Sequence, residues 1–254
     1  MACAARRALR NRELRLHYQP KFDMVTRRLV GAEALIRWEH PDEGLLSPME
    51  FIPLAERSGL IVPIGAWALN EACRQAQTWR RAGLDDFHVA VNLSAVQFKH
   101  ADLLETVSEA LDGANLPAEA LELEITESML IDQGGDPGGT LAALTMRGVH
   151  LSIDDFGTGY SSLSYLKRFP VNVIKIDRSF TADLGDKQDA LVIVRAIIGL
   201  GHSLGLRVVA EGVETQAQLD LLAAEGCDFA QGYLLGRPLP VTDFERTFVP
   251  VTAF

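Results

Sequence analysis

The chain has 254 residues, 48% of them hydrophobic, which is enough to bury the core of one large domain or of two smaller ones. Its formal net charge of −10 argues against a surface for nucleic-acid polymers, which usually needs a basic stripe, but leaves room for a small anion held through metal ions. The three cysteines, Cys3, Cys73 and Cys227, are too few and too scattered for a disulfide framework or a zinc site, and they favour a reducing cytosol.

The first residues, MACAARRALRNREL, are basic and have no apolar segment of the kind found in signal peptides. No stretch reaches about 18 apolar residues without a charge, so we expect a cytoplasmic location and no membrane contact by this domain. Residues 1–13 are predicted to form a helix that leads into the domain and that could be the end of a linker from a longer protein.

Short β-rich runs alternate with longer segments of helical period along the chain, which indicates a largely parallel sheet covered by helices. No internal linker or repeat of solenoid length interrupts this pattern, so we interpret residues 1–254 as a single domain. The eight expected strands cover residues 14–20, 28–38, 87–94, 121–126, 149–155, 171–177, 206–212 and 229–235.

Helices are expected between most of these strands, with Ser47, Ser94 and Thr215 at helix starts and Gly83, Gly205 and Gly226 at helix ends. Their ranges are 48–59, 64–83, 94–111, 189–205 and 215–226. The first connection, FDMVTRR, is too short for a crossover helix, so the first two strands should form an antiparallel hairpin. Eight strands in about 250 residues predict an α/β fold, a modified TIM (β/α)8 barrel with an antiparallel first strand.

Seven of the expected strands carry one polar residue between apolar neighbours near the carboxyl end. These residues are Glu33, Asn92, Glu124, Asp154, Lys175, Glu211 and Gln231. In a barrel the apolar neighbours would face the helices, and the polar residues would point inward at the end where barrel enzymes build their sites. One buried glutamate or asparagine is equally well explained as a hydrogen-bonded core residue, but seven in register favour a functional site.

The charges of this cluster narrow its chemistry. Five acids, Glu33, Glu124, Asp154, Asp155 and Glu211, stand against the single Lys175 and leave four negative charges. Carboxylates about 4 Å apart repel each other by roughly 4 kcal/mol, so the cluster must bind protons or cations. Oxygen ligands without histidine or cysteine suit Mg²⁺ or Mn²⁺, and paired metals of this kind commonly promote phosphodiester hydrolysis.

The stretch SIDDFGTGYSS (152–162) places two aspartates directly before two glycines. Neighbouring side chains of a strand point to opposite faces, so we expect Asp155 to turn toward the site only because the strand ends there. Gly157 and Gly159 would let the following backbone fold back over the site.

An alternative interpretation of Lys175 is that it forms a Schiff base, as a strand-end lysine does in aldolases. That role requires a depressed pKa, whereas the surrounding carboxylates would raise the pKa of this lysine. A charged lysine that orients a water or a phosphate is therefore the favoured interpretation.

Seven motifs of the chain occur together in one known family. In chain order they are EALIRW (33–38), VNLS (91–94), EITE (124–127), DDFGTGYSS (154–162), KID (175–177), EGVE (211–214) and QGY (231–233). From about residue 10 to about residue 245 the chain resembles the EAL domain, a bacterial cyclic di-GMP phosphodiesterase. The resemblance implies a modified TIM barrel with an antiparallel first strand, which hydrolyses one phosphodiester bond of cyclic di-GMP to give linear pGpG.

The resemblance also assigns roles, residue by residue. It implies a two-metal site for Mg²⁺ or Mn²⁺, with ligands Glu33, Asn92, Glu124, Asp154, Asp155 and Glu211, of which Asp154 bridges the metals and Glu211 acts through water or as the general base. It implies Glu33, Lys175 and Glu211 as catalytic residues, with Lys175 orienting the attacking water. It implies substrate contacts by Gln19, Leu35, Arg37, Glu214 and Gln231, and Glu127 as the anchor of the DDFGTGYSS loop.

The resemblance further implies a homodimer and a possible GGDEF or sensor domain in a longer protein. Because many family members have lost activity, a catalytically silent cyclic di-GMP receptor or regulatory module is the alternative function. Such loss shows as substituted acids or a degraded loop, and this sequence has neither; its one small departure is in LLGRPLP, where an aromatic residue often precedes the small one.

Overall fold

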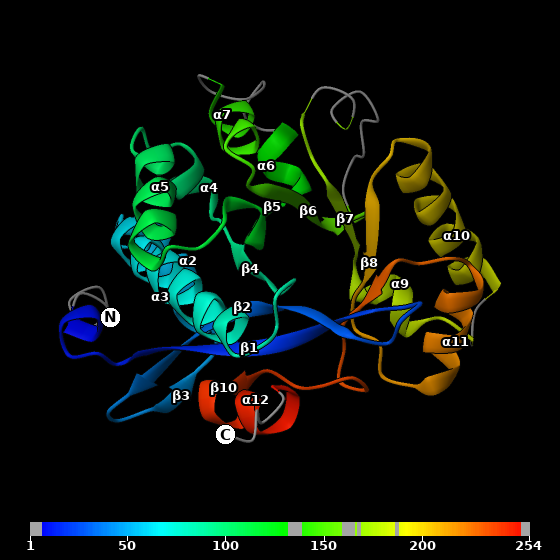
Figure 1. Cartoon of the computed structure of the whole chain (residues 1–254), viewed down its shortest axis with the longest axis horizontal. Coiled ribbons are helices and arrows are strands. Elements are labelled where there is room, and N and C mark those ends of the chain that lie inside the picture. The colour runs from blue at the N-terminus through cyan, green and yellow to red at the C-terminus, as the bar shows by residue number, and fades with distance from the viewer. Residues whose placement is uncertain (1–6, 132–138, 159–165, 167–168, 186–187, 250–254) are drawn as a thin grey trace.

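A mixed β-sheet closes into a barrel because its first strand, β1, pairs with β9 on one side and with β2 on the other (Figure 1). The structure, a computed structural model, describes residues 7–131, 139–158, 166, 169–185 and 188–249. The strands are β1 (Leu14–Asp23), β2 (Leu29–His40), β3 (Gly44–Leu46), β4 (His88–Asn92), β5 (Leu121–Thr126), β6 (His150–Phe156), β7 (Val173–Ile176), β8 (Arg207–Ala210), β9 (Phe229–Ala230) and β10 (Leu239–Pro240).

The predicted fold class is confirmed by the strand directions. β1 and β2 form an antiparallel hairpin whose register runs from Leu14 opposite Trp38 to Phe22 opposite Leu29. From β2 onward, the pairs β2–β4, β4–β5, β5–β6, β6–β7, β7–β8 and β8–β9 are all parallel. The chain is therefore an α/β barrel that departs from the eightfold parallel pattern only at its first strand.

The last predicted strand, at residues 229–235, is much shorter than expected. β9 ends at Ala230 because the chain turns at Gly232, whose carbonyl accepts hydrogen bonds from the amides of Leu235 and Gly236. The two short strands β3 and β10 were not predicted. They extend the hairpin outside the barrel and pair only with β2 and β1, respectively.

The helices lie outside the sheet, with α3 and α5 on one side of the barrel and α10 and α11 on the opposite side (Figure 1). They are α2 (Pro48–Arg57), α3 (Ile61–Arg81), α4 (Ala95–Phe98), α5 (Leu103–Ala114), α6 (Glu127–Ile131), α7 (Thr140–Met146), α9 (Arg178–Ala182), α10 (Gln188–Ser203), α11 (Gln216–Ala224) and α12 (Val241–Phe248), with a 3-10 turn at Ala118–Ala120. The expected starts at Ser47, Ser94 and Thr215 are all capping boxes, closed by the side chains of residues 50, 97 and 218.

Several helical features differ from the expectation, since α6, α7, α9 and α12 were not predicted. The helix expected over 94–111 is broken into α4 and α5, and the break leaves Phe98 and Leu103 both buried, so each short helix buries its own apolar side. The unpredicted α12 brings Phe244 against Tyr18 and Trp79, with ring centroids 6.2 Å and 4.6 Å away. Within the described ranges, no helix is both long and apolar enough to cross a membrane.

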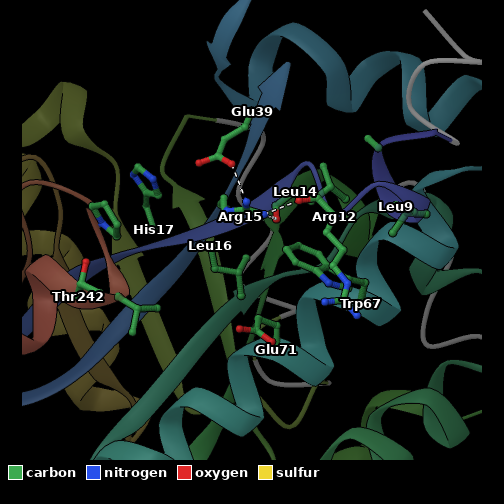
Figure 2. Close-up of a pocket in the computed structure, with 13 residues that line it drawn as sticks. Leu9, Arg12, Leu14, Arg15, Leu16, His17, Glu39, Trp67, Glu71 and Thr242 are labelled. Carbon is green, nitrogen blue, oxygen red and sulfur yellow. Dashed lines mark hydrogen bonds and ion pairs between the residues drawn. The ribbon is translucent and has the colours of Figure 1, made fainter. Parts of the chain in front are cut away.

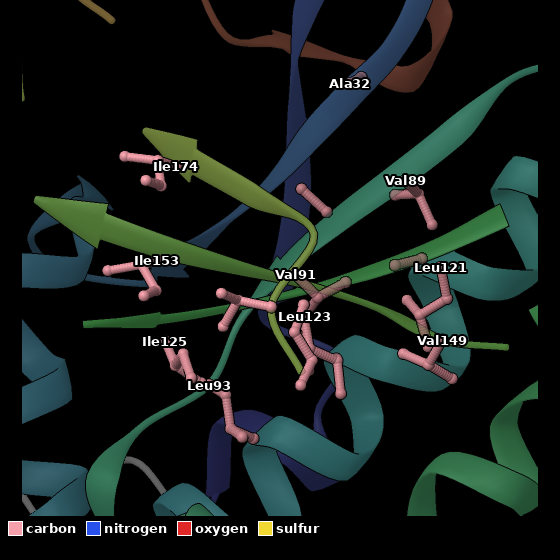
Figure 3. Close-up of a cluster of buried hydrophobic side chains, with 14 of the residues drawn as sticks. Ala32, Val89, Val91, Leu93, Leu121, Leu123, Ile125, Val149, Ile153 and Ile174 are labelled. Atoms are coloured by element: carbon pink, nitrogen blue, oxygen red, sulfur yellow. The ribbon is translucent and has the colours of Figure 1, made fainter. Parts of the chain in front are cut away.

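The barrel wall alternates apolar and polar side chains. Figure 3 shows the apolar set of the neighbouring strands, including Leu121, Leu123 and Ile125 of β5, all 1% exposed or less. The intervening Glu122 and Glu124 point into the barrel, where their carboxylates contact Lys21 and Lys175, respectively. The interior therefore holds two polar layers, an upper one at the carboxyl ends of the strands and a lower one beneath it.

Candidate functional site

The ammonium group of Lys175 lies at the centre of the upper layer, and the side chain is 1% exposed. Its Nζ is 2.7 Å from Oε2 of Glu124 and 2.7 Å from Oε1 of Glu211. It is also 3.2 Å from Oδ1 of Asp154 and 3.7 Å from Oε2 of Glu33. Carboxylates from β2, β5 and β6 and from the residue that follows β8 thus converge on one cation.

Three amide side chains complete this network. Glu33 accepts hydrogen bonds from Nδ2 of Asn92 at 2.7 Å and from Nε2 of Gln231 at 2.6 Å. Gln231 also donates to Oε1 of Gln19 at 3.2 Å, and Gln19 in turn donates to the carbonyl of Gly236. The structure therefore brings together all seven strand-end residues singled out from the sequence, with Gln19 as an eighth member.

The electrostatic environment separates the roles of these groups. Burial lowers the pKa of Lys175, but the charges of Glu124 and Glu211 outweigh it and hold the pKa well above its usual range. Lys175 is therefore an ammonium ion at neutral pH, which disfavours a Schiff-base function. Burial raises the pKa of Glu211 to about 8, and the charge of Lys175 offsets this only in part.

The pKa values of Glu33 and Glu124 are shifted in opposite directions. Burial alone would raise the pKa of Glu33, but Lys175 and the hydrogen bond from Gln231 hold it below the ordinary value. Burial and the charge of Glu33 raise the pKa of Glu124 well above the ordinary value. A proton on Glu124 can be shared with Glu33, since the two carboxyl groups are within hydrogen-bonding reach.

The donor set of the upper layer suits a hard divalent cation. The four carboxylates and the single ammonium leave three negative charges when all are ionised, and Oε1 of Glu124 is buried and meets no hydrogen-bond donor among the described residues. The bond from Asn92 to Glu33 uses the amide nitrogen and leaves the oxygen as a ligand. In the part of the chain that the structure describes, no three histidine, cysteine or acidic side chains have the spacing of a ready metal site, and the carboxylates are oriented on Lys175 instead.

Asp155 is placed at the rim by a bulge and not by the end of its strand, so the expected reason for its turn was wrong. β6 continues to Phe156, and its register with β7 shifts between Ile153 and Phe156. Asp155 itself has a left-handed backbone with φ of 54°, and its amide donates to Oδ1 of Asp154. The carboxyl groups of this pair consequently point to different partners, Asp154 to Lys175 and Asp155 to Asp177.

Asp177 was quoted in the KID motif but received no predicted role. Burial raises the pKa of Asp155, and the charges of Asp154 and Asp177 and the hydrogen bond to Asp177 raise it further. Asp177 also caps α9, because its Oδ1 accepts the amide of Ser179 at 3.0 Å. The signal that could have identified Asp177 is its position two residues after Lys175, at the end of the same strand.

Glu127, the first residue of α6, is 8% exposed and accepts the amide of Gly157 at 3.4 Å. Gly157 has φ of 96°, and a Cβ at this position would lie 3.0 Å from the ring of Phe180. These contacts position the start of the DDFGTGYSS loop. The expected fold-back at Gly159 lies outside the described residues.

Two cavities open beside the upper layer, and both are lined by Glu33 and Leu35. One has a volume of about 180 Å³ and is lined by Gln19, Leu35, Arg178, Glu211, Glu214, Gln231 and Tyr233 among others. The other, of about 480 Å³, is mostly apolar and extends from Asn92 to the side chains of α2 and α3. Arg37 is half-buried next to these cavities, and its guanidinium donates to the carbonyl of Ile36.

A further cavity, of about 580 Å³, lies away from these residues (Figure 2). It is formed by Leu9, Arg12, Trp67 and Glu71 with the start of α12, and the ion pair between Arg15 and Glu39 spans 2.7 Å at its edge. None of the residues predicted to be functional lines this cavity, so the strand-end cluster stands as the candidate site.

A closed barrel with one antiparallel strand and an acidic strand-end cluster defines the EAL class of barrel domains, and the EAL domain model matches residues 2–238. The chain therefore belongs to the EAL domain family. It is 52% identical over 235 residues to the bifunctional diguanylate cyclase/cyclic di-GMP phosphodiesterase MucR of Pseudomonas aeruginosa, a match that covers 92% of this chain and 34% of MucR. It is 46% identical to the cyclic di-GMP phosphodiesterase NbdA of the same species, with 95% of this chain and 31% of NbdA covered.

The chain thus spans about a third of the length of the curated relatives it matches. Among solved structures, the MucR phosphodiesterase in its c-di-GMP complex superposes with a TM-score of 0.89 at 50% identity. That match covers 94% of this chain and 97% of the solved chain, so the similarity extends over nearly the whole barrel.

Proposed function

We propose that this chain hydrolyses one phosphodiester bond of cyclic di-GMP and releases linear pGpG. The observation that carries the proposal is the convergence of Glu33, Glu124, Asp154 and Glu211 on Lys175 at the carboxyl end of an EAL barrel. The names of MucR and NbdA as cyclic di-GMP phosphodiesterases and the bound c-di-GMP in the MucR structure support the same substrate.

The proposal includes a divalent-metal requirement. Glu33, Asn92, Glu124 and Asp154 would hold one Mg²⁺ or Mn²⁺, and Asp154 with Asp155 would hold a second, with Glu211 connected through water. When bound, such ions supply Lewis-acid stabilisation of the phosphoryl oxygens and lower the pKa of a bound water. The buried oxygen of Glu124 without a donor among the described residues and the all-oxygen donor set support this assignment.

Proton transfer and orientation of the attacking water would be carried out by side chains of the site. Glu211, with its raised pKa, would accept the proton of the attacking water at Oε1, the oxygen that now lies on Lys175. The ammonium group of Lys175 would orient the water or a phosphoryl oxygen by donating hydrogen bonds. Gln231 and Asn92 donate hydrogen bonds to the two carboxylate oxygens of Glu33. These bonds would keep the orientation of the Glu33 carboxylate fixed during turnover.

The substrate would lie across the two cavities that share Glu33 and Leu35. Gln19, Glu214 and Gln231 border the smaller cavity, and the half-buried Arg37 stands beside it with a fork suited to a phosphate. Glu127 would keep the loop that carries Asp155 close to this surface through its bond to Gly157.

The direct test is incubation of the protein with cyclic di-GMP and Mg²⁺ or Mn²⁺, followed by chromatographic detection of pGpG. We expect turnover that chelators abolish and that Ca²⁺ supports poorly, since Ca²⁺ is larger and less strict about octahedral geometry. Absence of pGpG at all protein concentrations would overturn the proposal.

One observation favours the alternative, a catalytically silent cyclic di-GMP receptor: the carboxylates are oriented on Lys175, and no three of the described acids have a ready metal-site spacing. Saturable binding of cyclic di-GMP without any pGpG would establish that function. We also propose a homodimer, testable by light-scattering mass, and a GGDEF or sensor domain beside this one in the full-length protein.

A further inference from the structure

The first strand of the barrel has one edge that its neighbours cover only in part. β2 pairs with β1 continuously from Leu14 to Phe22. On the other edge, β10 pairs only with His17 and Tyr18, and β9 joins only at the last two residues of β1. Among the strands of the described ranges, none pairs with residues 14–16 on this second edge. The start of β1 therefore has a free edge about 10 Å long.

The backbone of Leu16 points toward this free edge. The amide of Glu39 donates to the carbonyl of Glu13 at 2.8 Å, which directs the backbone groups of Glu13 toward β2. Because this direction alternates along an antiparallel strand, Leu14 and Leu16 direct their backbone groups the opposite way. The carbonyl of Leu14 accepts a hydrogen bond from the guanidinium of Arg15 at 2.9 Å. The amide and carbonyl of Leu16 thus face the free edge as a donor and an acceptor for an added strand.

The cavity of about 580 Å³ in Figure 2 opens along this edge. Residues 14–17 of β1 line it, together with Pro240, Val241 and Thr242. β10 runs antiparallel to β1 and ends at Pro240, and the chain then leaves the sheet as α12 from Val241 onward. The cavity consequently occupies the place where a longer β10 would have continued along β1.

One side of the cavity is apolar. Leu9 of the entry helix, Leu16 of β1 and Trp67 of α3 all line it. His17 lines it as well, but burial and the charge of Arg37 lower the pKa of this histidine, so its ring is neutral at pH 7. Alternate side chains of a strand point to the same face, so every second residue of an added strand would meet this apolar surface.

Arg12 carries the unbalanced charge of the cavity. The two acids of the lining, Glu39 and Glu71, are each paired with an arginine, Arg15 at 2.7 Å and Arg74 at 2.6 Å. Within the described ranges, the guanidinium of Arg12 forms no such ion pair. Its backbone is left-handed with φ of 55°, which is uncommon for a residue other than glycine. The cavity therefore suits an occupant with a negative charge near Arg12.

We propose that the free edge of β1 docks an extended peptide segment of a partner protein, which pairs with Leu16 and places an acidic side chain on Arg12. Hydrogen bonds between backbones give affinity in this type of recognition, and contacts of alternate side chains give specificity. A peptide fits better than a nucleic acid because the chain has a net charge of −10. The strand-end acids do not line this cavity, so the inference is independent of the proposed function.

The test is selection of random heptapeptides displayed on phage against the immobilised protein. We expect enriched peptides to have apolar residues at every second position and one aspartate or glutamate at a fixed position. Arg12→Glu should change the preference at that position to lysine or arginine. Arg28→Glu, at an exposed arginine in the turn between β1 and β2, is the matched control and should select the same peptides as the wild type.

Binding of the most enriched peptide, labelled with fluorescein, gives the second readout. Arg12→Glu should weaken its Kd at least about tenfold, whereas Arg12→Lys should retain most of the affinity and Arg28→Glu all of it. The melting temperature of each variant shows whether it is folded. No enrichment by the wild type, or an enriched peptide that binds Arg12→Glu as tightly as the wild type, would overturn the inference.

Methylation of the peptide's amide nitrogens, one at a time, distinguishes an added strand from other modes of binding. Successive amides of a strand point to opposite edges, so only alternate positions should lose affinity, each by about tenfold. Equal effects at all positions, or no effect at any position, would contradict pairing with β1.

Discussion

Nζ of Lys175 lies 2.7 Å from Oε2 of Glu124, and both side chains are 1% exposed. Neither charge has bulk water to stabilise it, so each depends on the other and on the remaining acids of the upper layer. Lys175→Met should therefore abolish turnover and lower the free energy of unfolding of the metal-free protein by about 3 kcal/mol or more.

Urea unfolding and pGpG release together check this prediction. Mg²⁺ should restore part of the lost stability, because a divalent cation can replace the missing charge. Lys99→Met, at an exposed lysine, is the control and should change neither quantity. A Lys175→Met variant with wild-type stability without metal would contradict the central role of this charge.

Glu211→Gln removes the proposed proton acceptor but keeps the shape of the side chain. We expect kcat to fall by about 10²–10⁴-fold, the usual contribution of a general base, while cyclic di-GMP still binds. Turnover and equilibrium binding are measured on the same preparation, with Glu105→Gln at an exposed position as the control. Loss of binding equal to the loss of turnover would mean that Glu211 serves the ligand and not the proton.

Gly157 and Gly185 form a matched pair for testing the loop. Their φ angles are 96° and 95°, but a Cβ on Gly157 would meet Phe180 at 3.0 Å, whereas a Cβ on Gly185 would meet nothing within 4 Å. Both alanine variants should lose about 1–2 kcal/mol of stability from backbone strain. Only Gly157→Ala should also lower kcat/KM, because it displaces the backbone that follows Asp155; equal activity of the two variants would exclude this coupling.

Lys21 and Glu122 form the ion pair of the lower layer, with an Nζ to Oε2 distance of 2.7 Å and side chains 7% and 5% exposed. Lys21→Met alone should cost about 3–5 kcal/mol, since it leaves a buried carboxylate without its partner. The double variant Lys21→Met/Glu122→Leu should recover most of this loss. Glu39→Gln, which breaks the exposed pair with Arg15, should cost no more than about 1 kcal/mol in the same urea titration.

The hydrogen bonds to Asp228 lead us to predict that the free energy of unfolding depends on pH. Burial raises its pKa, but the hydrogen bonds from Arg207 and His202 outweigh burial and hold the pKa below the ordinary aspartate value of 3.8. A carboxyl with a lowered pKa stabilises the folded state above its unfolded pKa and loses this effect as the pH falls through the folded pKa. Asp228→Asn should therefore cost about 1–3 kcal/mol at pH 7 and progressively less below about pH 4. Asp85→Asn, at an exposed aspartate, should show no such trend.

The sequence was sufficient to predict the barrel and the members of the upper layer, because both follow from the two-residue alternation of strands. Glu33, Glu124 and Lys175 share the inward parity of their strands, and the structure places their charged groups together. The hairpin could also be predicted from the sequence, because the seven residues between the two expected strands are too few to form a crossover helix.

The features that could not be predicted depend on backbone geometry or on partners from distant strands. The bulge at Asp155 leaves no mark in the side-chain pattern, and the turn that shortens β9 depends on the contact of Gly232 with Val213. Glu122 has the same parity as Glu124 and was visible in LELEIT, but its partner Lys21 lies 101 residues earlier in the chain. The role of Asp177 was missed because it requires the rotated carboxyl of Asp155 as its partner.

The position of β1 in the barrel also has a consequence for the order of assembly during synthesis. β1 pairs with β2 at once, but Phe22 and Asp23 meet their other partners only when Ala230 and Phe229 have been made. Until then one edge of the hairpin has unpaired backbone groups that can join any other strand. A nascent chain therefore carries an open, aggregation-prone edge for most of its translation, and a chaperone that covers residues 14–23 should improve its yield more than one that binds the helices.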